Sequence, residues 1–225
     1  MLGVKIVNTK ASSLKGGLLN TQYSAATGGN TSSSDKVWGG YLAHEVSVPS
    51  PHDNYLMVCK YGTSALIEKY ISTVVFTREE LYEKIKDWVG DKGTIPEELF
   101  AELDGKLPLY AVSYDGDGTA GQGDAWNAVY HTNFYYLNND GKKVVITGHR
   151  MRSALGLRSH AFRTSYDAAT GKITITTQGH GHGVGLSQMG AIGFANEDGW
   201  DYLQILKHYY SVTASSEHQV VAPKW

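Results

Sequence analysis

Hydrophobic side chains recur at helical spacing in the middle of the chain. Leu81, Ile85 and Val89 follow one another at i, i+4 and i+8, which places them on one face of a helix. The letters Thr-Arg-Glu-Glu at 77–80 form a capping box directly before this run, so the helix is predicted to begin there. With a second short helical pattern just after it, this region is predicted to be a helical insert spanning about residues 54–105.

Strand patterns occupy much of the remaining chain. The clearest is a hairpin, because Asn139-Asp140-Gly141 separates two apolar, β-branched and aromatic runs. Further expected elements are a short helix over 148–156, two strands within 159–177, and helices over 186–197 and 200–210. The pattern predicts an α+β fold with a strand-rich core, several short helices and the helical insert. We expect residues 1–225 to form a single domain.

Composition and charge narrow the class of protein. Of 225 residues, 41% are hydrophobic and 19% are charged, an ordinary balance for a globular protein. Twenty Lys and Arg against 22 Asp and Glu give a net charge of −2, which argues against nucleic acid as the main partner. No apolar run is long enough for a membrane-spanning helix. The single cysteine, Cys59, cannot form an internal disulfide and is expected to be a small buried side chain.

Two segments match known motifs only in part, and each lacks a feature that its motif requires. Residues 116–121 match a Gly-x-Gly-x-x-Gly pattern, but they do not lie between a strand and a helix, so a turn-rich loop is expected instead of a dinucleotide site. Residues 185–189 approach the nucleophile elbow of α/β-hydrolases, but Met189 stands where that turn requires glycine. Neither motif therefore supports an enzyme class.

Glycine is concentrated around two histidines. The chain has 26 glycines in 225 residues, above the usual share of about 7%, and six of them fall between 179 and 193. In an extended segment His180 and His182 point to the same side, which suggests a two-nitrogen metal clamp. Such a clamp needs further ligands, for which His160, His208 or an acid are candidates. The alternatives are structural histidines, or histidines that contact a sugar or transfer a proton.

Four blocks of sequence resemble one bacterial family. They are Gly181–Gly193, which resembles G-H-G-V-G-[ML]-S-Q-x-G-A-x-G, followed by Ile205–Tyr210 (I-L-x-H-Y-Y), and upstream Arg152–Ser159 (R-x-x-L-G-L-x-S) and Tyr23–Gly29 (Y-S-S-x-S-G-G). The resemblance of this last block continues through Val37-Trp38 and from Tyr41-Leu42 to Pro51-His52-Asp53. In kind and in order they resemble the SpoIID/LytB family of bacterial cell-wall proteins.

The resemblance implies a lytic transglycosylase that acts on peptidoglycan glycan strands, or a modulator of wall amidases. In the enzyme, one Glu protonates the glycosidic oxygen and the C6 hydroxyl of the sugar closes a 1,6-anhydro ring, which is general acid and then base catalysis by a single carboxyl. That Glu precedes the block matched by Tyr23–Gly29, and we expect it to lie outside this chain, which would then be the C-terminal portion of the family domain. We assign the catalytic role to neither Glu45 nor Asp53.

Two loops are expected to meet in a glycan-binding groove. The predicted contact residues are Tyr23, Ser24, Thr27, Gly28 and Gly29 on the first loop, and His182, Ser187 and Gln188 on the second. We predict no metal and no cofactor. The resemblance implies peptidoglycan strands as a partner, with a cell-wall amidase or other wall hydrolase as a second partner, at an extracellular or cell-envelope location reached through a signal or anchor outside this chain.

Three alternatives stay open from sequence. The chain is a non-catalytic module that binds the wall or modulates an amidase, or it is a metal-dependent hydrolase built on His180 and His182. In the third alternative the segment Gly181–Gly193 is purely architectural, with glycines that let a helix pack against strands.

Overall fold

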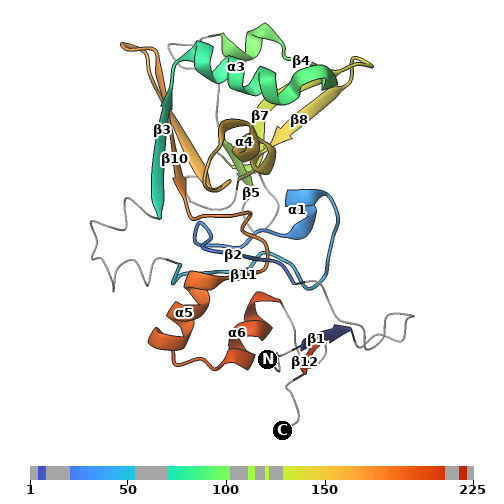
Figure 1. Cartoon of the computed structure of the whole chain (residues 1–225), viewed down its shortest axis with the longest axis vertical. Helices are drawn as coiled ribbons and strands as arrows, with labels where there is room; N and C mark the ends of the chain where they lie inside the picture. The colour runs from blue at the N-terminus through green and yellow to red at the C-terminus, as the bar shows by residue number, and fades with distance from the viewer. Residues whose placement is uncertain are drawn as a thin grey trace.

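The structure, a computed structural model, describes residues 5–8, 21–53, 70–101, 111–114, 120–121, 129–210 and 218–221. Strands and short helices alternate along the chain and confirm the predicted α+β class. Figure 1 shows an elongated molecule with an upper body that contains most of the strands and a lower body that contains the last two helices. No helix among the described residues is long and apolar enough to cross a membrane.

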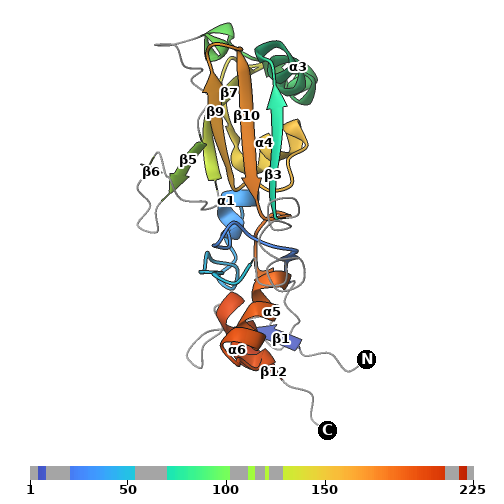
Figure 2. The same ribbon diagram turned by 90° about the vertical axis from the view of Figure 1, so that its left-hand side faces the viewer.

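The upper body combines two antiparallel sheets with two helices. In the first sheet the central strand β10 pairs with β3 and β9, and in the second β7 pairs with β4, β5 and β8. Figure 2 shows β3, β9 and β10 running along the long axis of the molecule. The elements are β3 (Ile71–Phe76), α3 (Arg78–Val89), η1 (Gly90–Lys92), β4 (Gly93–Thr94), η2 (Glu97–Phe100), β5 (Ala111–Tyr114), β6 (Ala120–Gly121), β7 (Val129–Asn138), β8 (Lys143–Thr147), α4 (Gly148–Leu155), β9 (Phe162–Asp167) and β10 (Lys172–Gln178).

A single apolar core fills the upper body. Leu81, Ile85 and Val89 of α3 are fully buried, as their spacing predicted, and pack in one cluster with Phe134 of β7 and Ile175 of β10. Burial of each such side chain contributes about 1.5–3 kcal/mol, so this cluster supplies the main stabilisation of the upper body.

The local signals around α3 and the hairpin are confirmed. The Thr77 hydroxyl accepts from the Glu80 amide at 3.1 Å, and the Glu80 carboxylate accepts from the Thr77 amide at 2.8 Å. Strands β7 and β8 pair across the predicted turn.

The prediction of a helical insert over 54–105 needs a correction. The segment also contains strand β3, whose β-branched residues pair with a strand 100 residues further along the chain. Residues 54–69 and 102–105 lie outside the described residues, as do Cys59 and most of the glycine motif at 116–121. The single-domain organisation stays a prediction.

The lower body has little regular structure and a small apolar cluster. Its α5 and α6 pack together around Phe194, Ile205, Tyr209 and Tyr210. Long loops between residues 21 and 53 cover the side that faces the upper body (Figure 1). The elements are β1 (Lys5–Asn8), β2 (Tyr23–Ser24), α1 (Ser34–Trp38), β11 (Leu186–Ser187), α5 (Gln188–Glu197), α6 (Tyr202–Tyr209) and β12 (His218–Val221), with β1 paired to β12 and β2 parallel to β11.

Candidate functional site

The glycine-rich segment joins the upper body to the lower body. Every second residue from 179 to 185 is a glycine with a positive φ, a conformation that other residues rarely adopt. A Cβ on Gly181 would lie 2.5 Å from the Cβ of Ser24, and one on Gly185 would lie 2.1 Å from the carbonyl oxygen of Gln22. Glycine is therefore required here both by the backbone conformation and by the close approach of the neighbouring loop.

Backbone hydrogen bonds hold this segment on two sides. His180 and Ala26 exchange amide-to-carbonyl bonds of 2.9 and 3.2 Å, which attaches the segment to the first loop. The Gly181 amide donates to the Arg158 carbonyl at 3.0 Å, which attaches it to the chain after α4. The glycine-rich segment is thus fixed between two stretches that are distant in sequence.

A buried carboxylate collects hydrogen bonds from three segments. Asp53, 1% exposed, accepts from the amides of Thr27 and Gly29 at 3.0 and 3.3 Å and from the Ser50 hydroxyl at 2.7 Å. The hydroxyls of Thr27 and Ser187 also donate to it. We call these five residues the Asp53 cluster.

The Asp53 cluster positions loops, and its side chains are shielded from solvent. Burial raises the pKa of Asp53, while hydrogen bonds from Ser187, Thr27, Ser50 and Gly29 act in the opposite direction. Hydrogen-bonded carboxylates satisfy otherwise costly buried donors, so the cluster fixes the first loop against the start of α5.

A tryptophan and three histidines meet where the two bodies join. The Trp38 ring lies 5.0 Å from the His182 ring and 6.4 Å from the His149 ring, measured between centroids. His160 lies 6.4 Å beyond His149 and is hydrogen-bonded through Nε2 to the Ser32 hydroxyl at 2.7 Å. Upper-body and lower-body residues thus contribute to one cluster of rings.

These histidines favour their neutral form. Burial is the largest cause that lowers the pKa of His149, His160 and His182, and the neighbouring Arg152 lowers each of them further. For the fully enclosed His160 the pKa falls to about 3. His182 Nδ1 accepts from the Val184 amide at 3.1 Å, so its proton resides on Nε2 when the ring is neutral.

Two residues with exposed aromatic rings contact His182, one through its ring and the other through its backbone. Tyr23 is 61% exposed and Trp38 is 46% exposed, and His182 is linked to both, through a hydrogen bond to the Tyr23 backbone and through the ring contact with Trp38. We call Tyr23, Trp38 and His182 the aromatic–histidine surface. Tyr41 and Leu42, also exposed, follow shortly after α1. Exposed aromatic groups of this kind mark binding surfaces more often than scattered single side chains do.

Comparison with known proteins gives three informative relatives. The chain is 29% identical to a stage II sporulation protein D of Bacillus amyloliquefaciens over 88% of its length, and 26% identical to that of Bacillus subtilis over 92%. It is 26% identical to an amidase enhancer of Bacillus subtilis over 95% of its length. These matches confirm the resemblance to the SpoIID/LytB family. The chain covers 45%, 48% and 32% of these three relatives, less than half of each. No family model matches the chain.

The structure brings the family-like blocks together in space. Ala26 of the Tyr23–Gly29 block forms a β-bridge with His180, directly before the Gly181–Gly193 block. Ser159 of the Arg152–Ser159 block forms a β-bridge with Gly181. The hydroxyl of Tyr210, the last residue of the Ile205–Tyr210 block, donates to the Gln22 carbonyl at 2.8 Å, directly before the Tyr23–Gly29 block. The four SpoIID/LytB-like blocks therefore form one contiguous region.

The predicted contact residues separate into two groups. Ser24, Thr27, Gly28 and Ser187 are buried, Gly29 and His182 are partly buried, and Tyr23 and Gln188 are exposed. Thr27, Gly29 and Ser187 meet at Asp53, and the backbone of Tyr23 is hydrogen-bonded to His182. Sequence reasoning did not assign Asp53, Trp38 or His149 to the site, although the first two lie within or beside the blocks that carry the resemblance.

Among the described residues, the histidines proposed as metal ligands do not come together as a set of ligands. His180 is exposed, His160 is bonded to Ser32, and His208 donates through Nε2 to the Pro49 carbonyl at 2.7 Å. In the part of the chain that the structure describes, no three His, Cys, Asp or Glu residues lie close enough to hold a metal ion. The metal-clamp alternative therefore has no third ligand among these residues.

Proposed function

We propose that this chain acts in the bacterial cell wall and binds glycan strands of peptidoglycan on the aromatic–histidine surface. The names of the relatives support a role connected with the wall, at an extracellular or envelope location. Sugar rings carry C–H-rich faces that pack on exposed aromatic rings, while their hydroxyls accept and donate hydrogen bonds. Tyr23, Trp38 and His182 offer both kinds of contact on one surface.

The observation that carries the proposal is the contrast between exposed rings and their rigid support. Trp38 and Tyr23 project into solvent, yet the loop beneath them is fixed by the Asp53 cluster and by the glycine-rich segment. A pre-ordered surface binds at a lower entropic cost than a flexible one. Ser24, Thr27 and Ser187 then act as supports, and Tyr23, His182 and Gln188 as the contacts.

Activity as a lytic transglycosylase needs more than a surface that binds glycan. It requires a carboxyl that reaches the glycosidic oxygen. Glu45 is fully buried and accepts from the Gln22 amide at 2.9 Å, and Asp53 is buried in its cluster. Because both carboxyls are buried and hydrogen-bonded within the protein, we assign both to the support of the loops and propose glycan binding as the role of the described residues.

Binding to purified sacculi tests the proposal. We expect Trp38→Ala and Tyr23→Ala to weaken binding at least tenfold, because each removes an exposed ring from the surface. The matched control is Tyr202→Ala. It removes a ring that is 49% exposed and belongs to the first residue of α6. Unchanged binding in both surface variants, or an equal loss in the control, would overturn the proposal.

A second candidate function is modulation of a wall amidase. It is favoured by the amidase enhancer that matches 95% of the chain. Here the chain would raise the rate at which a purified wall amidase releases stem peptides from sacculi. If Trp38→Ala loses sacculus binding and keeps the stimulation, the amidase contact lies elsewhere; if both are lost, glycan binding underlies the stimulation.

A further inference from the structure

Positive charge is concentrated in one stretch of the chain, which includes α4. Residues 142–196 contain seven Lys or Arg and one acid, whereas the chain as a whole has a net charge of −2. The acid, Asp167, accepts from the Ala169 amide at 3.0 Å and from the Thr170 hydroxyl at 2.7 Å, within the turn between β9 and β10. It is therefore engaged in its own turn and does not neutralise the cations of α4, Arg150 and Arg152.

Arg152 is a partly buried cation at the junction of the two bodies. Its Nε donates to the Arg158 carbonyl at 3.1 Å, which fixes the guanidinium and leaves its two terminal amino groups for other partners. Burial lowers the pKa of Arg152, and among the described residues no carboxylate forms an ion pair with it. A cation removed from water is costly unless it is paired. A guanidinium pairs best with a carboxylate or a phosphate, through two parallel hydrogen bonds.

Two neutral donors lie close to this guanidinium. The rings of His149 and His182 both contact Trp38, at centroid distances of 6.4 and 5.0 Å. His182 Nδ1 accepts from the Val184 amide, so its proton resides on Nε2. The enclosed Nδ1 of His149 has no hydrogen-bond partner among the described residues. Because no bond holds the proton there, Nε2 of His149 can carry it. Both rings can thus donate a hydrogen bond beside Trp38.

The charges around these histidines have one sign. Burial is the largest cause that lowers the pKa of His149, His160 and His182, and the further lowering comes from the neighbouring histidines and from Arg152, with Arg150 also acting on His149. Among the described residues, no carboxylate raises any of these pKa values. A site with a fixed cation, several donors and no negative charge favours an anionic ligand.

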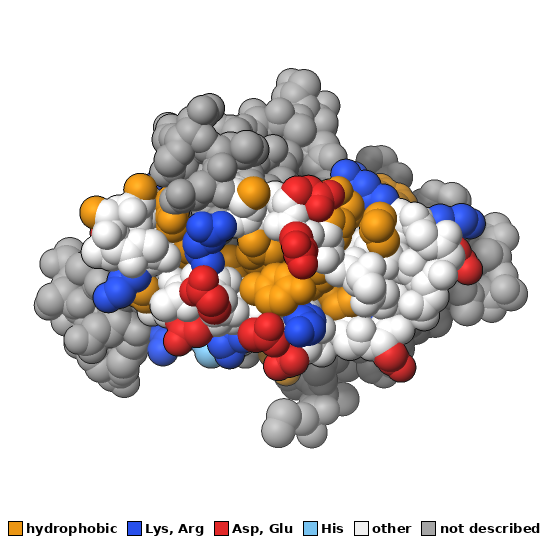
Figure 3. Space-filling view, turned by 90° about the horizontal axis from the view of Figure 1, so that it is seen from above, with side chains coloured by type: hydrophobic (Ala, Val, Ile, Leu, Met, Phe, Trp, Pro, Cys, Tyr) orange, Lys and Arg blue, Asp and Glu red, His pale blue; other side chains and the backbone are white. Residues whose placement is uncertain are grey.

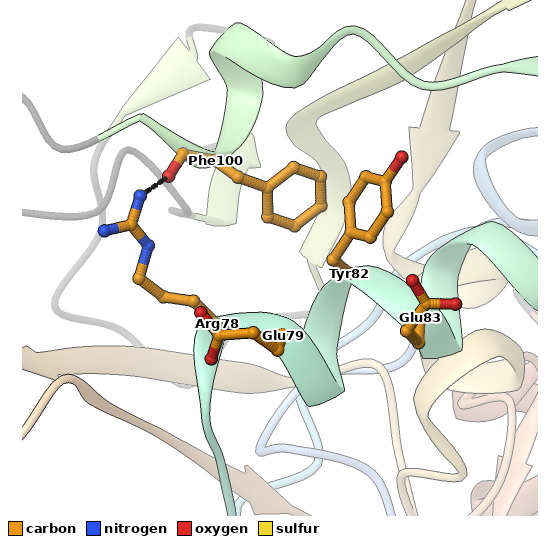
Figure 4. A pocket seen from close by; sticks show the side chains of 5 residues that line it. All are labelled: Arg78, Glu79, Tyr82, Glu83 and Phe100. Atoms are coloured by element: carbon orange, nitrogen blue, oxygen red, sulfur yellow. Dashed lines mark hydrogen bonds between the residues drawn. The ribbon is translucent and has the colours of Figure 1, made fainter.

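The outer side of α3, at the far end of the upper body (Figure 1), differs from this junction. Acidic and basic side chains surround hydrophobic ones there (Figure 3). Beside a hollow of about 370 Å³, Arg78 donates to the Phe100 carbonyl (Figure 4). Lys86 forms an ion pair with Glu83 at 3.5 Å. These cations are engaged with neighbouring acceptors and acids of the protein, in contrast to Arg152.

We propose that Arg152, His149 and His182 form an anion subsite beside Trp38 that selects an acidic sugar of the glycan, one that carries a free carboxylate or a phosphate ester. The anionic oxygens accept from the terminal amino groups of the guanidinium and from the imidazole N–H groups, while the sugar ring packs on Trp38. Arg150, exposed on the same helix, adds charge attraction at the rim. The subsite rests on the proposed glycan binding and deepens it, because it names the class of sugar that the surface prefers.

Three tetrasaccharides of equal length test the subsite in titrations with the wild-type chain. One is a neutral N-acetylglucosamine oligomer, the second alternates N-acetylglucosamine with N-acetylmuramic acid that has a free carboxylate, and the third carries a 6-phosphate. We expect at least one acidic probe to bind about tenfold more tightly than the neutral one, with a preference that weakens as salt is added. The tighter acidic probe identifies the anion. Equal binding of all three overturns the subsite and leaves glycan binding intact, whereas no binding of any probe overturns both.

Variants separate the subsite from general surface charge. Arg152→Gln should reduce the preference for the acidic probe to about twofold or less, and Arg152→Lys should keep part of it because the charge remains. The matched control is Lys172→Gln, which removes an exposed cation at the first residue of β10 and should leave the preference unchanged. An Arg152→Gln protein that keeps the full preference would contradict the proposal.

A second variant covers the case in which Arg152→Gln does not fold, since that change also removes the bond to the Arg158 carbonyl. Arg150 is exposed, and Arg150→Gln should lower the preference about twofold to threefold with an unchanged thermal midpoint. A preference equal to that of wild type in Arg150→Gln would then overturn the subsite. Trp38→Ala should weaken all three probes, so the loss of glycan binding and the loss of charge selection are distinguished.

Discussion

The upper and lower bodies differ in what holds them together. The upper body is built around an apolar core in which Leu81, Ile85 and Phe134 are fully buried. The lower body combines a small apolar cluster with a buried carboxylate that accepts hydrogen bonds from Thr27, Ser50 and Ser187. Apolar packing tolerates many arrangements, whereas a buried polar cluster is stable only when each donor finds its acceptor. The polar cluster therefore suits a binding surface made of loops, because loops lack the regular backbone hydrogen bonds that fix a strand or a helix.

Removal of a core ring from the upper body should have the largest effect on stability. Phe134→Ala deletes a fully buried ring, and such changes cost about 3–5 kcal/mol. We expect the midpoint of urea denaturation to fall accordingly. Because the loss is apolar, the native protein that remains should still bind sacculi under stabilising conditions. Loss of binding by fully folded protein would show that the two bodies are not separable in this way.

Removal of the buried Asp53 carboxylate should lower the free energy of unfolding nearly as much, but its effect should be concentrated in the lower body. Asp53→Ala leaves several buried donors without an acceptor, and we expect about 3 kcal/mol of destabilisation. Hydrogen exchange should accelerate in residues 22–29 and 185–190 more than in the strands of the upper body. Uniform acceleration across both bodies would contradict a local role for the Asp53 cluster.

Acid should weaken the junction of the two bodies. The folded-state pKa of His160 is lowered from 6.5 to about 3, so its contribution is fully present above pH 6.5 and is lost as pH falls toward 3. At about 1.4 kcal/mol per pKa unit, this loss is about 2 kcal/mol by pH 5. His160→Gln should flatten the dependence of unfolding free energy on pH between 7 and 5. An unaltered slope would mean that His160 is not buried in its neutral form.

The smallest expected effect concerns the helix at the edge of the upper body. Thr77→Ala removes the side-chain oxygen that caps α3 and should cost about 1 kcal/mol. Thr77→Ser keeps the oxygen and serves as the control. Equal thermal midpoints for the alanine variant and wild type would indicate that core packing alone defines the start of α3.

The features predicted from sequence are those fixed by neighbouring residues. The cap of α3 involves Thr77 and Glu80, three residues apart, and the β7–β8 hairpin is defined by its own turn. The Asp53 cluster was missed because Ser187 lies 134 residues from Asp53. Strand β3 was missed for a similar reason, since its pairing partner is β10.

The candidate site was predicted in part. Tyr23 and His182 were identified through the resemblance of their blocks to the SpoIID/LytB family, and the structure links them directly. The contact between Trp38 and His182 depends on how α1 sits against the glycine-rich segment, which neither pattern nor spacing encodes. Ser24, Thr27 and Ser187 look like surface donors in sequence, but the folded loops bury them.

The most direct test of the proposed glycan surface is an NMR titration of the chain with a purified peptidoglycan glycan fragment. The indole N–H resonance of Trp38, assigned by its disappearance in Trp38→Phe, reports on the surface itself. We predict that this resonance and the amides around Tyr23 and His182 shift in a saturable manner, with the other tryptophan indoles unchanged. Saturable shifts confined to other regions, with the Trp38 indole unmoved, would contradict the account.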